Sequence, residues 1–249
     1  MLYTPLVLGI AAARRMPWTV LLVVAVATLV FTARESLAAW SRVRKQGREP
    51  EPALRIVVIE LGFAAACGAV LVGRERLFGL VPLGLVALAL FGIHFAQLRR
   101  REQRTLEAEI LAIVGLTLTA PATYYVARGS WAATAVWLWA LCVLYFASSV
   151  FYVKLRVLSL QPRRDRERRD MRAGALAYHA VLLAVLVGFV VARRLPALAL
   201  LAFVPVLART SWSLARPTTQ VNLRRVGVLE ILYSVNFLVF TALAFAGRS

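Results

Sequence analysis

The sequence predicts an all-α fold, a polytopic transmembrane helical bundle of about nine helices. Hydrophobic residues make up 61% of the 249 residues, more than the core of one soluble domain can bury. Apolar runs such as Thr19–Phe31 and Leu80–Phe91 are continuous, whereas the strands of a membrane barrel alternate apolar and polar residues. Because lipid offers backbone groups no partner, such runs are expected to be helices.

Nine hydrophobic segments follow one another, and each is expected to form one helix of a single integral membrane domain, residues 1–249. About twenty residues are needed to cross a ~30 Å hydrocarbon core as a helix. The first segment ends before Arg14 and is too short to cross unaided. The segments cover residues 2–13, 17–33, 53–73, 77–97, 107–127, 130–153, 174–192, 195–213 and 226–246.

The second segment is expected to continue beyond the membrane as an amphipathic helix. Leu37, Trp40 and Val43 alternate with basic residues there, and Pro50 and Pro52 then end the stretch. Together with three other basic connections it forms the set of expected cytoplasmic loops, at about residues 34–52, 98–106, 154–173 and 214–225.

The distribution of basic residues predicts the orientation in the membrane. Positively charged residues concentrate in cytoplasmic loops. The stretches Arg34–Arg55, Arg99–Arg104, Lys154–Arg172 and Arg209–Arg225, at the ends of the apolar segments that border these loops, hold 22 of the 30 Lys and Arg residues. We therefore expect a multi-pass protein of the bacterial inner (cytoplasmic) membrane, with its N-terminus in the cytoplasm and its C-terminus outside.

The net charge of +18 also raises the possibility of nucleic-acid binding. The basic residues recur wherever an apolar run ends, which favours a role in topology and in attraction to the anionic headgroups of the bilayer. We therefore expect lipid as a partner and no nucleic acid. Cys67 and Cys142 lie inside apolar runs without metal-ligand spacing, so neither a metal site nor a cofactor is predicted.

Three glutamates lie inside predicted membrane helices, where a charge is costly and is commonly functional. Glu60, Glu109 and Glu230 each follow an arginine by five residues. One interpretation is structural, with each glutamate paired to an arginine of a neighbouring helix. The other is that they line a cavity open to the cytoplasm.

Further candidates for the lining of such a cavity are hydroxyl side chains of the fifth and sixth segments, which are Tyr124, Tyr145, Ser148 and Tyr152. Serine and tyrosine also commonly connect helices in lipid, and His94 and His179 are interpreted as packed, hydrogen-bonded residues. Basic residues at the cavity mouth are candidates for anion binding, namely Arg34, Arg99, Arg100, Lys154 and Arg156.

The stretch Arg104–Arg156 reads RTLEAEILAIVGLTLTAPATYYVARGSW and, further on, LWALCVLYFASSVFYVKLR. It resembles the YwiC-like family of bacterial membrane proteins, and the resemblance extends over most of the chain. Family members usually begin with a Glu-His-Gly segment before the first helix. The sequence Met1-Leu-Tyr-Thr-Pro-Leu-Val-Leu-Gly resembles the middle of that helix, so we expect a His-Gly-containing extension upstream of Met1.

The helix number and the long loops after even-numbered helices also resemble the UbiA-type prenyltransferase superfamily, which implies a ring of helices. Those enzymes hold Mg²⁺ and a prenyl diphosphate with two aspartate-rich motifs. The first motif region here, Ala33–Arg42, contains one acid, and the second has Lys154 and Arg156 near the expected acids. Asp165 and Asp170 lie among arginines, so the metal-dependent mechanism is not expected.

The leading functional hypothesis is binding or handling of an anionic-headed lipid, isoprenoid or quinone in a cytoplasm-facing cavity. Arginine would replace magnesium at the headgroup. No G-x-S-x-G, P-loop or H-E-x-x-H motif is found, which disfavours an enzyme. Two alternatives remain open: a small transporter that uses the intramembrane glutamates, with Pro121 and Pro205 interrupting helices, and a ligand-free membrane assembly factor.

Overall fold

The computed structural model describes residues 2–47, 51–100, 105–161, 164–215 and 223–246, without the side chains of residues 45, 98–100 and 223. All regular elements of these ranges are helical, and each of the nine predicted segments contains one or two helices, which confirms the fold class. Within the same ranges, seven helical segments are long and apolar enough to cross a membrane. The chain is therefore a multi-pass membrane protein.

Two compact units make up the chain, an N-terminal unit of Leu2–Trp139 and a C-terminal unit of Ala140–Ser249. The expected single membrane domain stays a prediction, since the contacts inside each unit do not define how the two associate.

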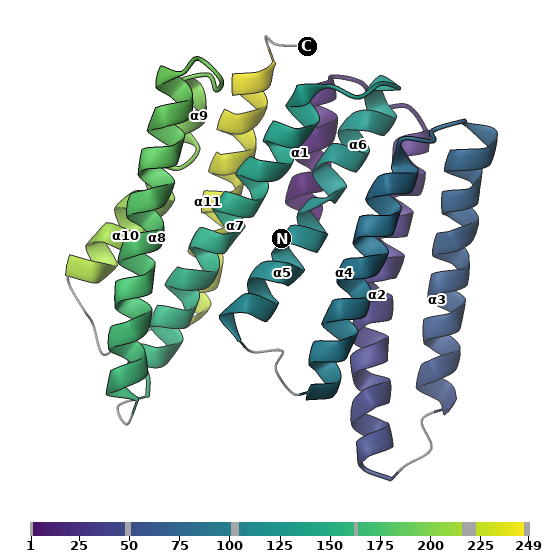
Figure 1. Cartoon of the computed structure of the whole chain (residues 1–249), viewed down its shortest axis with the longest axis horizontal. Helices are drawn as coiled ribbons and strands as arrows, with labels where there is room; N and C mark the ends of the chain where they lie inside the picture. The colour runs from purple at the N-terminus through teal and green to yellow at the C-terminus, as the bar shows by residue number, and fades with distance from the viewer. Residues whose placement is uncertain (1, 48–50, 101–104, 162–163, 216–222, 247–249) are drawn as a thin grey trace. The chain divides into compact units, whose positions relative to one another are not determined.

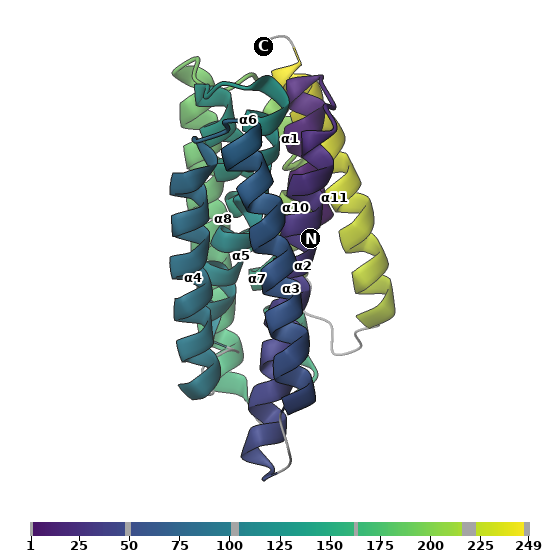
Figure 2. The same ribbon diagram turned by 90° about the vertical axis from the view of Figure 1, so that its right-hand side faces the viewer.

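The helices of the N-terminal unit pack in pairs. α2 packs along α3, the short α1 packs on α6, and α4 packs on α5 (Figures 1 and 2). A π-helical turn, η1, continues α3 directly. The bounds are Tyr3–Ala13 for α1, Thr19–Lys45 for α2, Glu51–Ala69 for α3, Val70–Arg74 for η1, Leu80–Arg100 for α4, Leu106–Thr117 for α5 and Thr119–Arg128 for α6.

The amphipathic continuation of the second segment is helical, as predicted, because α2 runs without interruption to Lys45. The expected loop at residues 34–52 is therefore helix over most of its length. Pro52 lies in the first turn of α3. N–H groups of a first turn have no acceptor within the helix, so a proline at this position costs no hydrogen bond. Pro50 lies outside the described residues.

Proline also explains the interruption between α5 and α6. Pro121 has no N–H for the carbonyl of Thr117, and its ring crowds that turn, so α5 ends at Thr117 and α6 begins two residues later. Thr117 Oγ1 donates to the Ile113 carbonyl at 2.8 Å, and Thr119 Oγ1 donates to the Leu116 carbonyl at 2.8 Å. Hydroxyls thus satisfy carbonyls near the break.

A glycine allows α1 to approach α6 closely. A Cβ at Gly9 would overlap Thr123 Oγ1 and the Ala120 carbonyl. Thr123 Oγ1 lies 3.2 Å from the Leu6 carbonyl of α1, and also within 2.8 Å and 3.1 Å of the Thr119 and Ala120 carbonyls of its own helix. The α1 helix therefore uses a small residue where a bulky one would separate the two backbones.

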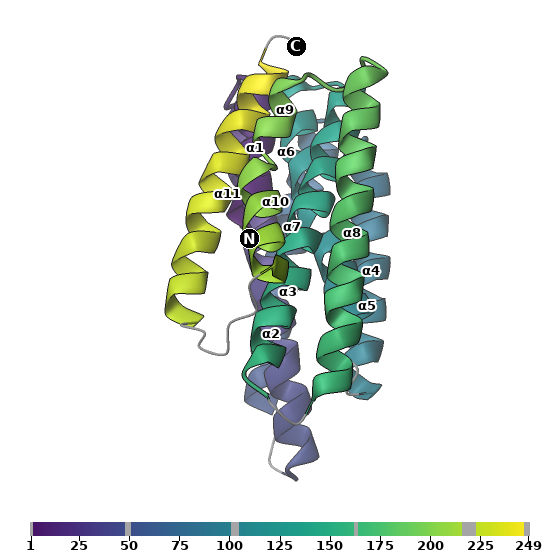
Figure 3. The ribbon, with the colours of Figure 1, turned by 90° about the vertical axis from the view of Figure 1, so that its left-hand side faces the viewer.

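The C-terminal unit contains most of α7 (Ala133–Ser159), α8 (Asp165–Val191), α9 (Leu198–Leu201), α10 (Val204–Ala215) and α11 (Leu223–Phe245). In Figures 1 and 3, α7, α8 and α11 run along similar directions, and Figure 1 shows α10 inclined to α8. α10 contacts α8, and α11 contacts the short α9.

The C-terminal unit has a helix interruption of its own, between α9 and α10. This interruption lies just before Pro205, which has no N–H to donate to the Leu201 carbonyl four residues earlier. The amide Nδ2 of Asn236 on α11 lies 3.3 Å from both the Leu201 and the Ala202 carbonyls. Asn236 therefore supplies donors to backbone carbonyls that the interrupted helix leaves without their usual partners.

The chain direction places the basic helix ends together within each unit. In the N-terminal unit the C-terminal ends of α2 and α4 lie at the same end as the starts of α3 and α5 (Figure 1). In the C-terminal unit the ends of α7 and α10 lie with the starts of α8 and α11. Most basic residues of the described helices thus lie toward one end of each unit, and Arg14, Arg15, Arg74, Arg76, Arg128, Arg193 and Arg194 lie toward the other. The side of the membrane stays a prediction.

Candidate functional site

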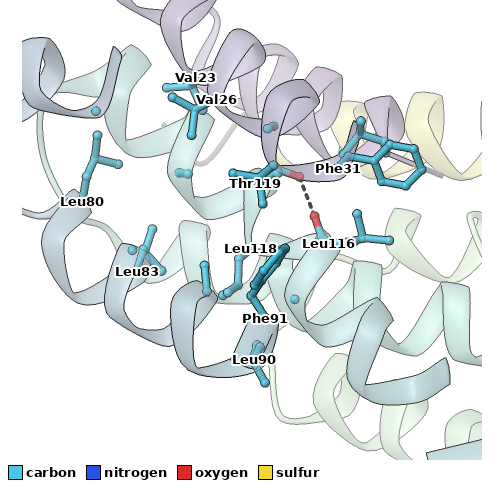
Figure 4. A pocket seen from close by; sticks show the side chains of 18 of the residues that line it. Val23, Val26, Phe31, Leu80, Leu83, Leu90, Phe91, Leu116, Leu118 and Thr119 are labelled. Carbon is cyan, nitrogen blue, oxygen red and sulfur yellow. Dashed lines mark hydrogen bonds between the residues drawn. The ribbon is translucent and has the colours of Figure 1, made fainter. Parts of the chain in front are cut away.

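A pocket of about 380 Å³ lies inside the N-terminal unit, between α2, α4 and the interrupted helix α5–α6 (Figure 4). Aliphatic and aromatic side chains form nearly all of its wall. Those from α2 and α4 include Val23, Phe31, Leu80 and Phe91, and Leu116 and Leu118 come from the interruption. Its size lies at the lower end of the range of small-molecule sites.

Glycines and the helix break keep this space open. Gly68 and Gly84 line the pocket, and a Cβ added at either would meet no atom within 4 Å. Leu118 sits in the break between α5 and α6, where the regular helix surface that would pack against α4 is interrupted. The sequence therefore leaves a gap between helices that are otherwise rich in leucine and valine.

One end of the pocket is polar because Arg34 and His94 lie there. Arg34 Nε donates to His94 Nε2 at 2.9 Å. A guanidinium N–H can only donate, so Nε2 must accept and the imidazole carries its hydrogen on Nδ1. This Nδ1 is buried and has no hydrogen-bond partner within the described part of the chain.

The pocket is long along the helix axes. Val23 and Arg34 are separated by about 16 Å of rise along α2, and Leu80 and His94 by about 21 Å along α4. One leaflet of a bilayer has a hydrocarbon thickness of roughly 15 Å, half of the full core. The site is therefore an apolar slot about one leaflet long, with a guanidinium at one end.

A second polar cluster is buried in the C-terminal unit around Arg209. Arg209 on α10 forms an ion pair with Glu230 on α11, with 6% and 16% of the two side chains exposed. Its guanidinium carbon lies 4.2 Å from the ring centroid of Tyr152 and 5.1 Å from that of Tyr233. Its Nη2 donates to Ser149 Oγ at 3.2 Å. The cluster connects α7, α10 and α11.

Hydrogen bonds also connect α7 to α8 in this unit. His179 Nδ1 lies 2.7 Å from the Ala175 carbonyl, so it carries the hydrogen, and Nε2 accepts from Ser148 Oγ at 2.8 Å. Tyr178 donates to the Leu144 carbonyl at 2.7 Å. Ser148 is fully buried, so this serine–histidine pair resembles a helix-to-helix contact more than an accessible nucleophile.

The structure brings several of the predicted site residues together, but not around the pocket. Tyr152 and Glu230 both contact Arg209. Tyr145 is buried in the same unit and stacks on Phe237 with ring centroids 4.2 Å apart. Glu230 thus pairs with an arginine of a neighbouring helix, which agrees with the structural interpretation of the three glutamates.

The remaining predicted residues lie in the N-terminal unit. Glu109 is in the first turn of α5, where the helix dipole favours an acid, whereas Glu60 lies well inside α3. Glu60 Oε2 is buried without a partner among the described residues. Tyr124 is buried on α6. Neither these three nor the four in the C-terminal unit line the pocket, so their role as cavity-lining residues stays a prediction.

The candidate anion-binding residues also divide between the units. Arg34 lines the pocket. Arg156 Nε donates to the Tyr152 hydroxyl at 3.3 Å, and Lys154 is half-buried on α7. The side chains of Arg99 and Arg100 lie outside the described residues.

The sequence reasoning missed two features. Arg209 was counted among the basic residues that set orientation, although its position four residues after a helix-breaking proline was a signal that it lies within a membrane segment. The contact between Arg34 and His94 joins residues 60 positions apart, and no local pattern indicates it.

Comparison with known proteins gives a family for the first half of the chain. The model of the YwiC-like protein family matches residues 1–124. No curated protein and no solved structure matches the chain. The matched segment ends in α6 and contains every residue that lines the pocket, whereas the Arg209 cluster lies beyond it.

Proposed function

Since the chain belongs to the YwiC-like family and the matched residues 1–124 include the whole pocket lining, we propose that this pocket is the functional site. It binds or handles one lipid or isoprenoid molecule with an anionic head. The tail lies along the apolar slot and the head lies at Arg34. The observation that carries the proposal is the combination of an apolar wall about one leaflet long with one guanidinium at its end.

Physical chemistry supports both parts of this ligand. Each buried methylene contributes about 0.8 kcal/mol to binding, so a chain that fills the slot supplies most of the affinity. A guanidinium binds phosphate or carboxylate through charge-assisted hydrogen bonds. Mg²⁺ prefers carboxylate oxygens, and the described lining contains no Asp or Glu, so in this proposal Arg34 neutralises the head.

We further propose that the head faces the cytoplasmic leaflet. Arg34 and His94 lie toward the ends of α2 and α4 that carry the basic clusters. Basic residues favour the cytoplasmic side, and the same side attracts anionic lipids. The slot would then take its ligand from the inner leaflet of the membrane.

A pair of glycine substitutions on α4 tests the site. Gly84→Leu places a side chain into the pocket, whereas Gly92→Leu adds the same side chain to the same helix outside the lining. Native mass spectrometry of the full chain in detergent should show one bound lipid on the wild type and on Gly92→Leu, and at least about fivefold lower occupancy on Gly84→Leu. Equal occupancy in both variants, or none on the wild type, contradicts the proposal.

A transporter is the second candidate, and the two interrupted helices favour it. Each unit contains one helix broken just before a proline, α5–α6 at Pro121 and α9–α10 at Pro205. Discontinuous helices in corresponding halves are common at transport sites. Proton flux into liposomes, measured for the wild type and for Gln variants of Glu60, Glu109 and Glu230, separates the two. Proton flux that is abolished in one of the Gln variants favours transport. The absence of both proton flux and bound lipid favours an assembly factor.

A further inference from the structure

The pocket has an opening on its side, between α3 and α4. α3 packs along α2 and α4 packs on α5, whereas the described residues of α3 and α4 show no packing of comparable extent against each other. The two helices diverge from the connection that joins them (Figures 1 and 2). No residue of Leu80–Gln97, the membrane-length part of α4, is buried. The pocket wall is therefore incomplete where these two helices face each other.

Glycines of both helices border the opening. Gly68 of α3 and Gly84 of α4 line the pocket, and a Cβ added at either position would meet no atom within 4 Å. Both glycines lie within about two helical turns of the connection between the helices, so they are at similar depth in the membrane. Neither glycine contributes a side chain that would fill the gap between the two backbones.

α4 turns opposite edges toward α5 and toward the opening. Leu90 lies against α5, because a Cβ at Gly115 would be 3.6 Å from Leu90 Cδ1. Val81 lines the pocket nine residues earlier, which places it about 180° around the helix from Leu90. Val81 is nevertheless 44% exposed. A residue that lines a pocket and is also exposed lies at its mouth, so the mouth is on the edge of α4 that faces away from α5.

Contacts with neighbouring helices hold α4 at both of its ends. At one end His94 accepts from Arg34 of α2, and beyond it the ring centroids of Phe95 and Trp40 are 6.4 Å apart. At the other end the Gly79 N–H, just before α4, donates to the Tyr125 hydroxyl of α6 at 3.1 Å. The side opening between these closures is the route that the described contacts leave for a ligand.

We infer that the pocket takes amphiphiles whose chains are longer than the slot, and that the surplus chain passes between α3 and α4 into the hydrocarbon core of the bilayer. This inference rests on the proposed function and narrows its ligand class. A pocket that is closed on all sides limits the length of the chain that it accepts, whereas a side opening removes that limit. The ligand class is thus long-chain lipids and polyisoprenoids with an anionic head.

The surroundings of the opening support a chain that protrudes into lipid. Leu61 lies seven residues before Gly68 and Leu88 lies four residues after Gly84, so each continues the helix edge of its glycine. Both leucines are exposed, at 37% and 68%. The protruding part of a chain is therefore in hydrocarbon before and after binding. Because this part leaves no water when it binds, its length changes the affinity little.

Competition between two chains of the same chemistry tests the inference. The full-length protein in detergent is loaded with farnesyl monophosphate and titrated with undecaprenyl monophosphate, whose chain is several times longer. Native mass spectrometry follows the exchange. We expect the long ligand to displace the short one at a single site and to bind no more than about threefold more weakly. An enclosed pocket would bind the long ligand at least about tenfold more weakly.

Matched substitutions locate the opening. Gly68→Phe places a ring between the two helices, whereas Gly62→Phe adds the same ring to α3 outside the pocket lining, where a Cβ also meets no atom within 4 Å. On α4, Val81 and Val86 are 44% and 47% exposed, and of these two Val81 lines the pocket. Gly68→Phe and Val81→Trp should weaken undecaprenyl monophosphate at least about fivefold and farnesyl monophosphate less than about twofold. The controls Gly62→Phe and Val86→Trp should weaken neither ligand.

The outcomes separate the inference from the function it rests on. Farnesyl monophosphate that binds and is not displaced by the longer ligand overturns the side opening and leaves the pocket as a lipid site. Both ligands bound at once, or equal weakening of both ligands in Gly68→Phe and Val81→Trp, also overturn the side opening. Unchanged binding in these two variants contradicts the place assigned to it. Binding of neither ligand to the wild type overturns both the inference and the proposed function.

Discussion

Neutralising one partner of the buried Arg209–Glu230 pair is expected to destabilise the protein more than neutralising both. The pair joins α10 to α11, and its two side chains are 6% and 16% exposed. Removing one partner of such a pair leaves the other charge buried without compensation, which typically costs about 3–5 kcal/mol. Replacing both partners by neutral side chains of similar volume is often nearly neutral.

The surroundings of Arg209 make the two single variants unequal. Arg209→Met leaves the Glu230 carboxylate alone and should lower the free energy of unfolding by about 3–5 kcal/mol. Glu230→Gln leaves a guanidinium that still faces the rings of Tyr152 and Tyr233 and still donates to Ser149. Cation–π contacts are worth about 0.5–2 kcal/mol each, so the loss should be smaller, about 2–3 kcal/mol.

A double-mutant cycle measures this coupling. Unfolding of the two single variants and of the double variant, followed in mixed micelles by denaturant titration, should give a double variant that is less destabilised than Arg209→Met alone. The control is the pair of Asp165 and Arg168 at the start of α8, whose side chains are 57% and 39% exposed and whose removal should cost about 0–1 kcal/mol. Additive effects of the Arg209 and Glu230 substitutions would refute the reasoning.

Three further substitutions test the packing within each unit, with unfolding in mixed micelles as the measurement. Gly9→Leu overlaps Thr123 and Ala120 and should cost about 1–3 kcal/mol; a loss below about 0.5 kcal/mol would contradict the close approach of α1 to α6. Asn236→Leu leaves the Leu201 and Ala202 carbonyls without their side-chain donor and should cost about 1–3 kcal/mol. Ser148→Ala removes the donor to His179 and should cost about 1 kcal/mol, and a stabilised variant would speak against that bond.

Much of the fold was predictable because each helix is encoded locally. The length of an apolar run and the arginines that end it define a membrane helix without reference to the rest of the chain. For the same reason the continuation of α2 to Lys45 was predictable from the spacing of Leu37, Trp40 and Val43. The proline at 121 also indicated a disturbance, although the exact break at Leu118 depends on the preceding turn.

The candidate site was much less predictable, because it depends on contacts between distant segments. Leucine and valine occur on all sides of these helices, so no apolar residue marks the face that borders the pocket. A cavity arises where residues are small or a helix breaks, as at Gly84 and Leu118. The predicted residues with hydroxyl groups were expected to line a cavity. In the structure, Ser148 instead forms a hydrogen bond with His179 of α8, and Tyr152 contacts Arg209 of α10, both in the C-terminal unit.

The contact between α1 and α6 depends on one hydroxyl hydrogen that three acceptors share. Thr123 can donate to Leu6 of α1 or to the carbonyls of Thr119 and Ala120 in its own helix. If α1 moves away, the hydroxyl simply turns to its own backbone, and no polar group is stranded. The contact of α1 with α6 is therefore decided by shape at Gly9, and the threonine hydroxyl would keep an acceptor even if the two helices were separated.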